Sequence, residues 1–225
     1  MNKINHALVM AAGRGTRMMP LTEKIPKAMA QYGETSLIVN GIEKIKKVLD
    51  NIHITVGYKK AELARHVVEH DISSIHNTEG KGNAWWVYNT LLSSLNEPIF
   101  VLTCDNVIDL DFDALASDYF ELGAPACMVV PVKPIEGLEG DYIFEVNNII
   151  RKLNRKDKSD KYCSGIQVLN PSKINQITQK VDDFYELWTQ LMAQNQLYCS
   201  NIFPKKWFTV DTIKQLEEVN KKLIG

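Results

Sequence analysis

The chain has 225 residues, of which 45% are hydrophobic and 24% are charged, and its formal net charge is −1. A chain of this size and apolar content can bury a sizeable core and lies in the range of one ordinary globular domain. Because acidic and basic residues are interspersed, no long-range field would draw the chain to a nucleic acid or to an anionic membrane.

The opening segment, MNKINHALVMAAG, is too short and too polar for a signal peptide or a membrane span. No later segment approaches ~18 consecutive apolar residues. The cysteines lie far apart and form no CxxC pair, whereas a disulfide framework or a zinc site normally shows closer spacing. The sequence therefore predicts a soluble cytoplasmic protein with reduced thiols at Cys104, Cys127, Cys163 and Cys199.

Short apolar or β-branched runs alternate with stretches of helical periodicity through the first part of the chain. One such stretch carries Ile38, Ile42 and Ile45 at helical spacing. This alternation predicts an α/β fold with a mixed, mainly parallel central sheet, which binds ligands at the carboxyl ends of its strands. Strands are expected at residues 6–12, 51–57, 73–77, 98–104 and 125–132.

The pattern changes from Gly140 onward. Three strand-like segments, 141–146, 149–154 and 163–169, follow one another and precede predicted helices at about 181–194 and 212–222. No repeat, low-complexity tract or convincing linker separates this part from the rest. We therefore expect a single domain, 1–225, with a first part at about 1–135 and a second part at about 136–225.

The loop after the first expected strand reads MAAGRGTRMMPLTEKIPKAM, from Met10 to Met29. Gly13 and Gly15 let the chain turn sharply and let backbone N–H groups approach an anion, as a phosphate cradle requires. Arg17 offers a planar fork of donors and Lys27 a compact charge, and both suit a polyphosphate. The alternative is a glycine turn with two surface cations. No GKS or GKT ends the loop and Met18 stands at the third glycine of GxGxxG, which argues against an ATPase loop or a dinucleotide fingerprint.

Over about twenty consecutive positions, LVMAAGRGTRMMPLTEKIPKAM resembles the signature of the sugar-phosphate nucleotidylyltransferases, approximately LAxGxGTRL, then Pro-Leu-Thr, then PKxM. The resemblance implies a Rossmann-like three-layer nucleotidyltransferase fold and extends over about residues 6–219. It implies that the part at about 1–135 binds the nucleotide and that the part at about 136–225 binds the substrate and carries the C-terminal helices. Among its types, the chain is similar to the N-acetylmuramate 1-phosphate uridylyltransferases and glucose-1-phosphate thymidylyltransferases. It implies that Arg17 and Lys27 are catalytic and that the nucleotide is bound by Ala11, Ala12, Gly13, Gly15 and Thr16.

The resemblance also implies two metal-binding aspartates. IFVLTCDNVI supplies Asp105 after a central strand, with Cys104 in place of the usual glycine and in the nucleotide-binding set. KWFTVDTIKQLEEV supplies Asp211 in a pattern like WxDVGTxExL. Two such carboxylates can converge on Mg²⁺, which prefers oxygen ligands and keeps waters and substrate phosphates in its shell.

A second acidic cluster, Asp109, Asp111 and Asp113, begins like a calcium loop. It lacks the glycine at the sixth place and has Phe120 where the bidentate glutamate belongs, so helix capping and solvation explain it better.

TEGKGNAWWVYNTL, residues 78–91, aligns with the family's base-reading region and places Gly82 and Asn83 in the nucleotide-binding set. Trp85 and Trp86 are adjacent on an expected helix and point about 100° apart. One of them is expected in the core, and the other is either core or near the nucleotide.

For the acceptor substrate, GDYIFEV resembles the family's GDYG segment, with Ile143 at the second glycine. KLNRK stands in the place of EKP, and CSGIQVLNP resembles the element that contacts the sugar. The residues that the resemblance assigns to substrate binding are Gly140, Arg155, Lys156, Ser164 and Gly165.

The resemblance predicts a Mg²⁺-dependent enzyme that transfers a nucleotidyl group from a nucleoside triphosphate to a sugar 1-phosphate and releases pyrophosphate. The alternative enzyme is a CTP-dependent cytidylyltransferase acting on a phosphorylated alcohol such as phosphocholine, and a second alternative is a nucleotide-binding domain without chemistry. The chain ends soon after the Asp211 segment, so an added acyltransferase module is not expected. The sequence does not identify the nucleoside base or the sugar, and it leaves open whether the protein forms a homo-oligomer.

Overall fold

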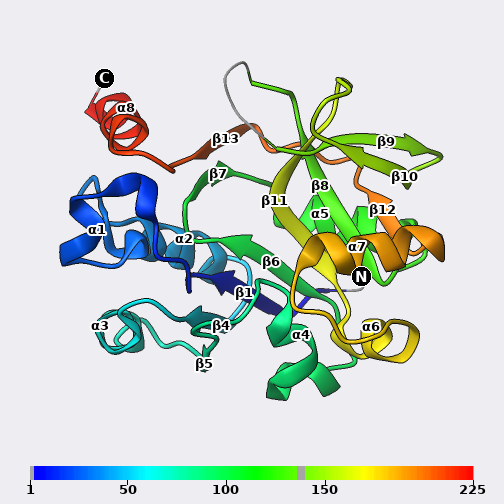
Figure 1. Ribbon diagram of the computed structural model, residues 1–225, viewed down its shortest axis with the longest axis horizontal. Coiled ribbons are helices and arrows are strands. Elements are labelled where there is room, and N and C mark those ends of the chain that lie inside the picture. The colour runs from blue at the N-terminus through cyan, green and yellow to red at the C-terminus, as the bar shows by residue number, and fades with distance from the viewer. Residues whose placement is uncertain (1–2, 136–139, 225) are drawn as a thin grey trace. The chain divides into compact units, whose positions relative to one another are not determined.

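The computed structural model describes residues 3–135 and 140–224, and they group into two compact units (Figure 1). The N-terminal unit consists of His6–Lys81, Leu102–Asp109 and the residues from Lys206 onward. The central unit consists of the described parts of Gly82–Val101 and Leu110–Lys205, together with residues 3–5. Every residue predicted to hold the triphosphate or the metal falls in the N-terminal unit.

A parallel ladder of strands forms the middle of the N-terminal unit. β1 (His6–Met10), β4 (Asn51–Val56) and β5 (Ser74–Asn77) follow the order β5-β4-β1. The register pairs Leu8 with His53, and the Cys104 N–H donates to the Met10 carbonyl at 3.0 Å. The carboxyl end of β1 thus lies beside that of β6 (Ile99–Thr103), at the edge where a parallel sheet binds ligands.

Around this ladder lie helices and short paired segments. Helix α2 begins because Ser36 accepts a hydrogen bond from the Val39 N–H, and its Ile38, Ile42 and Ile45 recur on one buried face. The helices are α1 (Leu21–Lys24), α2 (Leu37–Lys46), α3 (Lys60–Val68) and α8 (Ile213–Ile224), with 3₁₀ turns at Thr16–Met18 and Lys27–Met29. The short pairs are β2 (Gln31–Tyr32) with β3 (Thr35–Ser36), and β7 (Asn106–Asp109) with β13 (Lys206–Thr209).

The central unit contains a mixed sheet. Its order from β6 is β6-β11-β8-β12-β10-β9. β8 and β12 run parallel, whereas β11 is antiparallel to both of its neighbours and β10 is antiparallel to β12 and β9. The strands are β6 (Ile99–Thr103), β8 (Cys127–Val132), β9 (Tyr142–Val146), β10 (Ile149–Asn154), β11 (Tyr162–Leu169) and β12 (Leu197–Cys199).

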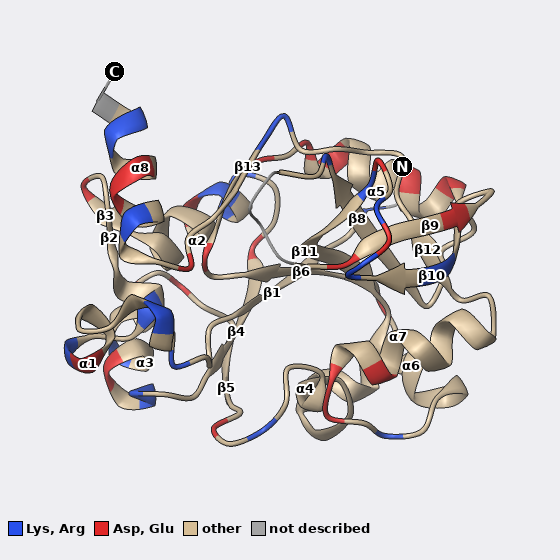
Figure 2. Cartoon of the chain, turned by 45° about the horizontal axis from the view of Figure 1, so that its top comes forward, with Lys and Arg blue, Asp and Glu red and all other residues tan. Residues whose placement is uncertain are grey.

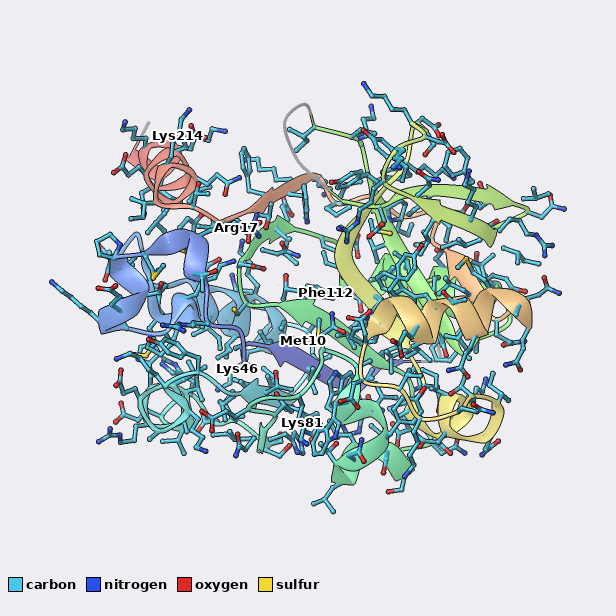
Figure 3. All side chains as sticks on the ribbon, viewed as in Figure 1. Met10, Arg17, Lys46, Lys81, Phe112 and Lys214 are labelled. Atoms are coloured by element: carbon cyan, nitrogen blue, oxygen red, sulfur yellow. The ribbon has the colours of Figure 1, made fainter. Side chains whose placement is uncertain are left out.

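The helices of the central unit are α4 (Trp85–Asn89), α5 (Phe112–Glu121), α6 (Pro171–Ile177) and α7 (Phe184–Ala193), with a 3₁₀ turn at Leu91–Ser94. Helix α5 begins where the Asp111 side chain accepts a hydrogen bond from the Ala114 N–H at 2.9 Å. This confirms helix capping as the explanation for the acidic cluster. Phe112, labelled in Figure 3, packs edge-on against Phe100 with ring centroids 5.1 Å apart. Trp86 is buried in the core.

The α/β fold class is confirmed, and the strands expected from apolar runs are present within a few residues of their predicted bounds. All four cysteines are free thiols. Basic positions (blue) and acidic positions (red) are interspersed along the chain (Figure 2). Within residues 3–135 and 140–224, none of the helices has the length and apolarity needed to cross a membrane.

Candidate active site

The loop after β1 is fixed at both ends. At its start the Ala11 N–H donates to Thr55 Oγ1 at 3.1 Å, and the Ala12 carbonyl accepts from the Tyr58 N–H at 3.0 Å. At its end the buried Thr22 hydroxyl donates to the Gly15 carbonyl at 3.0 Å. Figure 3 labels Met10, which is the last residue of β1, and Arg17, which lies in the 3₁₀ turn that follows Gly15. The backbone is therefore held in one shape before any ligand binds.

The middle of this loop is open. In the described part of the chain, the N–H groups of Gly13 and Arg14 have no hydrogen-bond acceptor. The Arg14 guanidinium lies over the Tyr58 ring, 5.4 Å from its centroid. Unpaired amides and a cation on an exposed, fixed loop are what an anionic ligand requires.

The two glycines of the loop serve different purposes. A Cβ on Gly13 would have no atom within 4 Å, so packing within the described chain does not require a glycine at this position. Gly15 has φ +66°, and a Cβ there would lie 2.7 Å from Lys27 Cβ. Gly15 therefore allows the stem of Lys27 to pass directly against the loop.

Lys27 links the two predicted metal aspartates. Its Nζ donates to Asp105 Oδ2 at 2.5 Å and to Asp211 Oδ1 at 2.8 Å. Arg17 NH2 contacts the same Asp211 oxygen at 2.8 Å. The side chains of Lys27, Asp105 and Asp211 are 11%, 20% and 20% exposed, whereas that of Arg17 is 69% exposed. The loop and both aspartates thus form one cluster within the N-terminal unit.

These contacts set the protonation of the cluster. Burial acts to lower the pKa of Lys27, but the charge of Asp105 and the hydrogen bonds to both carboxylates raise it above its ordinary value. Burial acts to raise the pKa of Asp211, but Lys27 and Arg17 hold it below its usual range. Burial, with the charge of Asp105, raises the pKa of the Cys104 thiol to about 12. At neutral pH Lys27 is an ammonium, Asp211 is a carboxylate and Cys104 is a neutral thiol.

An antiparallel ladder brings Asp105 and Asp211 together although they are far apart in the chain. β7 begins one residue after Asp105, and β13 ends two residues before Asp211. Asn106 pairs with Thr209, and the next bond runs from the Val210 N–H to the Asp105 carbonyl at 2.9 Å. The Lys44 ammonium of α2 donates to the Ile108 carbonyl at 2.6 Å and ties β7 to the unit.

The start of α8 fixes the backbone of Asp211. Gln215 Oε1 accepts from the N–H groups of Asp211 at 2.8 Å and Thr212 at 3.0 Å. In return Thr212 Oγ1 accepts from the Gln215 N–H at 3.2 Å. This is a capping box, and its sequence signal is the spacing of Thr212 and Gln215.

The predicted base-reading residues, Gly82 and Asn83, lie in the central unit. A Cβ on Gly82 would approach the Asp182 carbonyl oxygen to 2.1 Å. Asn83 Oδ1 accepts a hydrogen bond from the Phe184 N–H at 2.8 Å, at the first residue of α7. Both residues thus have a packing role that the sequence did not indicate, and their contact with a base stays a prediction.

The predicted acceptor-binding residues also lie in the central unit. Arg155 Nε donates to Asp141 Oδ1 at 3.3 Å, and its side chain is 72% exposed. The buried Ser164 hydroxyl donates to the Val130 carbonyl at 2.7 Å. Lys156 is exposed, and Gly165 has a φ of +82°. The substrate contacts of all the predicted residues, Gly140 included, stay predictions.

Tyr162 is a residue near this set that the sequence did not single out. A Cβ on Gly140 would lie 2.3 Å from its hydroxyl oxygen. That hydroxyl is buried and has no hydrogen-bond partner in the described part of the chain. Burial raises the pKa of Tyr162 to about 12, so the hydroxyl keeps its proton at neutral pH.

A family model described as nucleotidyl transferase matches residues 6–224. The chain belongs to the nucleotidyl transferase family. The match includes both units, so the resemblance seen in the loop and the aspartate segments is confirmed. A curated relative in the same family is the mannose-1-phosphate guanylyltransferase catalytic subunit beta of Drosophila melanogaster, 25% identical over 209 residues. The alignment includes 87% of this chain and 57% of the relative, so the chain spans a little over half of that protein's length.

Solved structures share the nucleotidyl transferase fold at low sequence identity. A Bacillus anthracis protein assigned as a glucose-1-phosphate thymidylyltransferase gives a TM-score of 0.79 at 16% identity, over 96% of this chain and 94% of that one. The CTP:phosphocholine cytidylyltransferase of Streptococcus pneumoniae gives a TM-score of 0.77 at 18% identity, over 98% of this chain and 99% of that one. At these identities the likeness concerns the fold alone.

The residues of the cluster fit a divalent metal of the kind that the family implies. The Lys27 ammonium, in contact with both Asp105 and Asp211, marks a position where a cation meets two carboxylates. The described residues contain no group of three or more His, Cys, Asp or Glu side chains that could hold a metal, so the cluster offers two carboxylates and no third ligand of these types. Two carboxylates suit Mg²⁺, which fills its remaining positions with waters and substrate phosphates.

Proposed function

We propose that the protein transfers a nucleotidyl group from a nucleoside triphosphate to a sugar 1-phosphate, giving a nucleotide sugar and pyrophosphate. The observation that carries the proposal is the contact of Lys27 with Asp105 and Asp211 directly beside the fixed, open loop. Family membership supports the reaction class. The curated relatives, which include mannose-1-phosphate guanylyltransferases, support a sugar 1-phosphate as the acceptor.

In this reaction an oxygen of the acceptor phosphate attacks the α-phosphorus, and the bond from that phosphorus to the bridging oxygen of the β-phosphate breaks. Pyrophosphate leaves with the electron pair, and catalysis requires positioning and charge neutralisation rather than a side-chain nucleophile. The free amides of Gly13 and Arg14 would bind the triphosphate together with Arg17. Lys27 would balance charge between the α-phosphate and the incoming phosphate.

Asp105 and Asp211 would hold Mg²⁺, which when bound neutralises phosphate charge. On the acceptor side, Arg155 and Lys156 would supply positive charge in place of the family's lysine. The hydroxyl of Ser164 is already bonded within its own unit, so sugar contact there would fall to backbone atoms of the Gly165 segment.

The test is a matrix of triphosphates and acceptors. The purified protein would be incubated with ATP, CTP, GTP, UTP or dTTP, with Mg²⁺, and with sugar 1-phosphates, phosphocholine or inositol 1-phosphate. Pyrophosphate release with at least one sugar 1-phosphate is the expected result. Release with phosphocholine or inositol phosphate and with no sugar phosphate would replace the proposal by the cytidylyltransferase alternative. Nucleotide binding without turnover on any acceptor would favour a binding domain.

A further inference from the structure

Within the N-terminal unit, the cations and carboxylates of the cluster balance one another. Lys27 Nζ lies 2.5 Å from an oxygen of Asp105 and 2.8 Å from an oxygen of Asp211, and Arg17 contacts that same Asp211 oxygen. One oxygen of each carboxylate that would hold a divalent ion therefore already binds a cation of the chain.

We propose that Lys27 is the resident cation of the metal site, and that the protein binds a divalent ion tightly only when a triphosphate removes Lys27 from the two carboxylates. The proposal rests on the proposed function in one respect, namely that the loop binds a triphosphate. It makes Lys27 responsible for coupling metal binding to nucleotide binding, in addition to its part in the reaction.

Electrostatics makes the two occupants mutually exclusive. An ammonium and a divalent ion repel each other strongly at the distance of a shared carboxylate pair that is largely removed from solvent. Without phosphate, a divalent ion would have to displace Lys27 and leave its charge in a partly buried position with no anion, which is costly. With a triphosphate in the loop, the displaced ammonium has a new anionic partner and the carboxylates are free for the metal.

The packing of Lys27 allows this exchange and limits it to the end of the side chain. A Cβ on Gly15 would lie 2.7, 3.2 and 3.1 Å from Cβ, Cγ and Cδ of Lys27, so the stem is held against the loop. Cε and Nζ lie beyond this fixed stem, so rotation about the Cδ–Cε bond moves the ammonium without moving the stem. Lys27 can therefore exchange the carboxylates for a phosphate on the adjacent loop without movement of the backbone.

Coupling of this kind is reciprocal and can be measured without catalysis. The first experiment titrates Mn²⁺ into the phosphate-free protein and follows free Mn²⁺ by electron paramagnetic resonance. We expect weak binding to the natural protein and binding tighter by roughly tenfold or more to Lys27→Met, within the range of measured coupling energies. Lys24→Met removes an exposed charge from the same segment and should bind Mn²⁺ like the natural protein. Equal Mn²⁺ affinity in the natural protein and a folded Lys27→Met variant would overturn the proposal.

A second experiment follows the natural protein and uses a conservative variant only to assign one signal. The ¹⁵N signal of the Lys27 ammonium, assigned by its loss in Lys27→Arg, would be followed as Mg²⁺ and inorganic tripolyphosphate are added. Mg²⁺ alone should leave the signal unchanged at concentrations where Mg²⁺ with tripolyphosphate shifts it. A full shift with Mg²⁺ alone would show that the metal displaces Lys27 unaided, which contradicts the proposal. Because neither readout involves transfer, a negative acceptor panel would reject the proposed function without touching this inference.

Discussion

Gly15 and Lys27 pack against each other so closely that a Cβ on Gly15 would lie 2.7 Å from Lys27 Cβ. This contact determines where the ammonium of Lys27 can reach, because the rest of the side chain passes along the loop. Gly15 is thus required for the position of the proposed catalytic group of Lys27 as well as for the turn.

The first prediction compares alanine at the two glycines of the loop. Gly15→Ala should displace Lys27 and also strain a backbone with φ +66°, which costs about 1–2 kcal/mol for a residue with a Cβ. We expect a loss of unfolding free energy of at least that size in urea, together with a lower kcat. Gly13→Ala has open space around it and should retain the stability of the natural protein while its KM for the triphosphate rises. The same kcat and stability in both variants would refute this distinction.

The second prediction concerns the charges of the cluster. Lys27→Ala or Asp105→Ala should reduce turnover by a factor of roughly 10² or more, which is typical for removal of a preorganised electrostatic group. Lys24→Ala is the control, because Lys24 is exposed in the same segment. Circular dichroism would check that the folds persist, and steady-state rates near that of the control would contradict the assigned roles.

The third prediction concerns the capping box at the start of α8. Gln215→Ala removes the acceptor for the N–H groups of Asp211 and Thr212, and loss of a helix cap lowers stability by about 1 kcal/mol. Because one of those groups belongs to Asp211, the variant should also need a higher Mg²⁺ concentration for half-maximal activity. Glu217→Ala, on the exposed side of the same helix, should change neither the urea midpoint nor the Mg²⁺ requirement.

The fourth prediction concerns a chain of histidines across β1, β4 and β5. His53 Nε2 lies 3.0 Å from His6 Nδ1, and His53 Nδ1 lies 2.7 Å from Ser74 Oγ, which in turn lies 2.7 Å from His76 Nε2. Burial, with the neighbouring His6 and His76, lowers the pKa of His53 from 6.5 to about 4. The unfolded chain therefore takes up the proton first as the pH falls.

Because the folded pKa of His53 lies below the unfolded one, its contribution to stability is complete above pH 6.5 and is lost as the pH falls toward 4. At pH 5 the loss from this residue should be about 2 kcal/mol relative to pH 7.5. His53→Gln should lose less unfolding free energy than the natural protein between these two pH values, as measured by urea denaturation. An identical pH dependence in both proteins would show that His53 titrates normally.

The sequence predicted the loop and both aspartates because the loop signature has a fixed internal spacing and each aspartate stands in its own motif. It also predicted the longer strands, since a buried strand such as Cys127–Val132 is a continuous apolar run. The family model confirms the resemblance on which the roles of these residues rest.

The sequence did not reveal the short pairs that assemble the site. β7 and β13 have four residues each and lie far apart in the chain, so neither shows a usable periodicity and their pairing is a long-range contact. The cap formed by Gln215 could have been found from the spacing of Thr212 and Gln215. The direct contact of Lys27 with both carboxylates could not, because it depends on three segments that only the fold brings together.

The pairing of β7 with β13 sets a condition on chain length. Successive side chains of a strand point to opposite faces, so one residue added or removed between Lys206 and Asp211 would turn Asp211 away and present Val210 or Thr212 instead. Substitutions within this stretch leave the direction of the carboxylate intact. The proposed metal site is thus more sensitive to the insertion or deletion of one residue in this segment than to a substitution, although only the last residue of the segment is a proposed metal ligand.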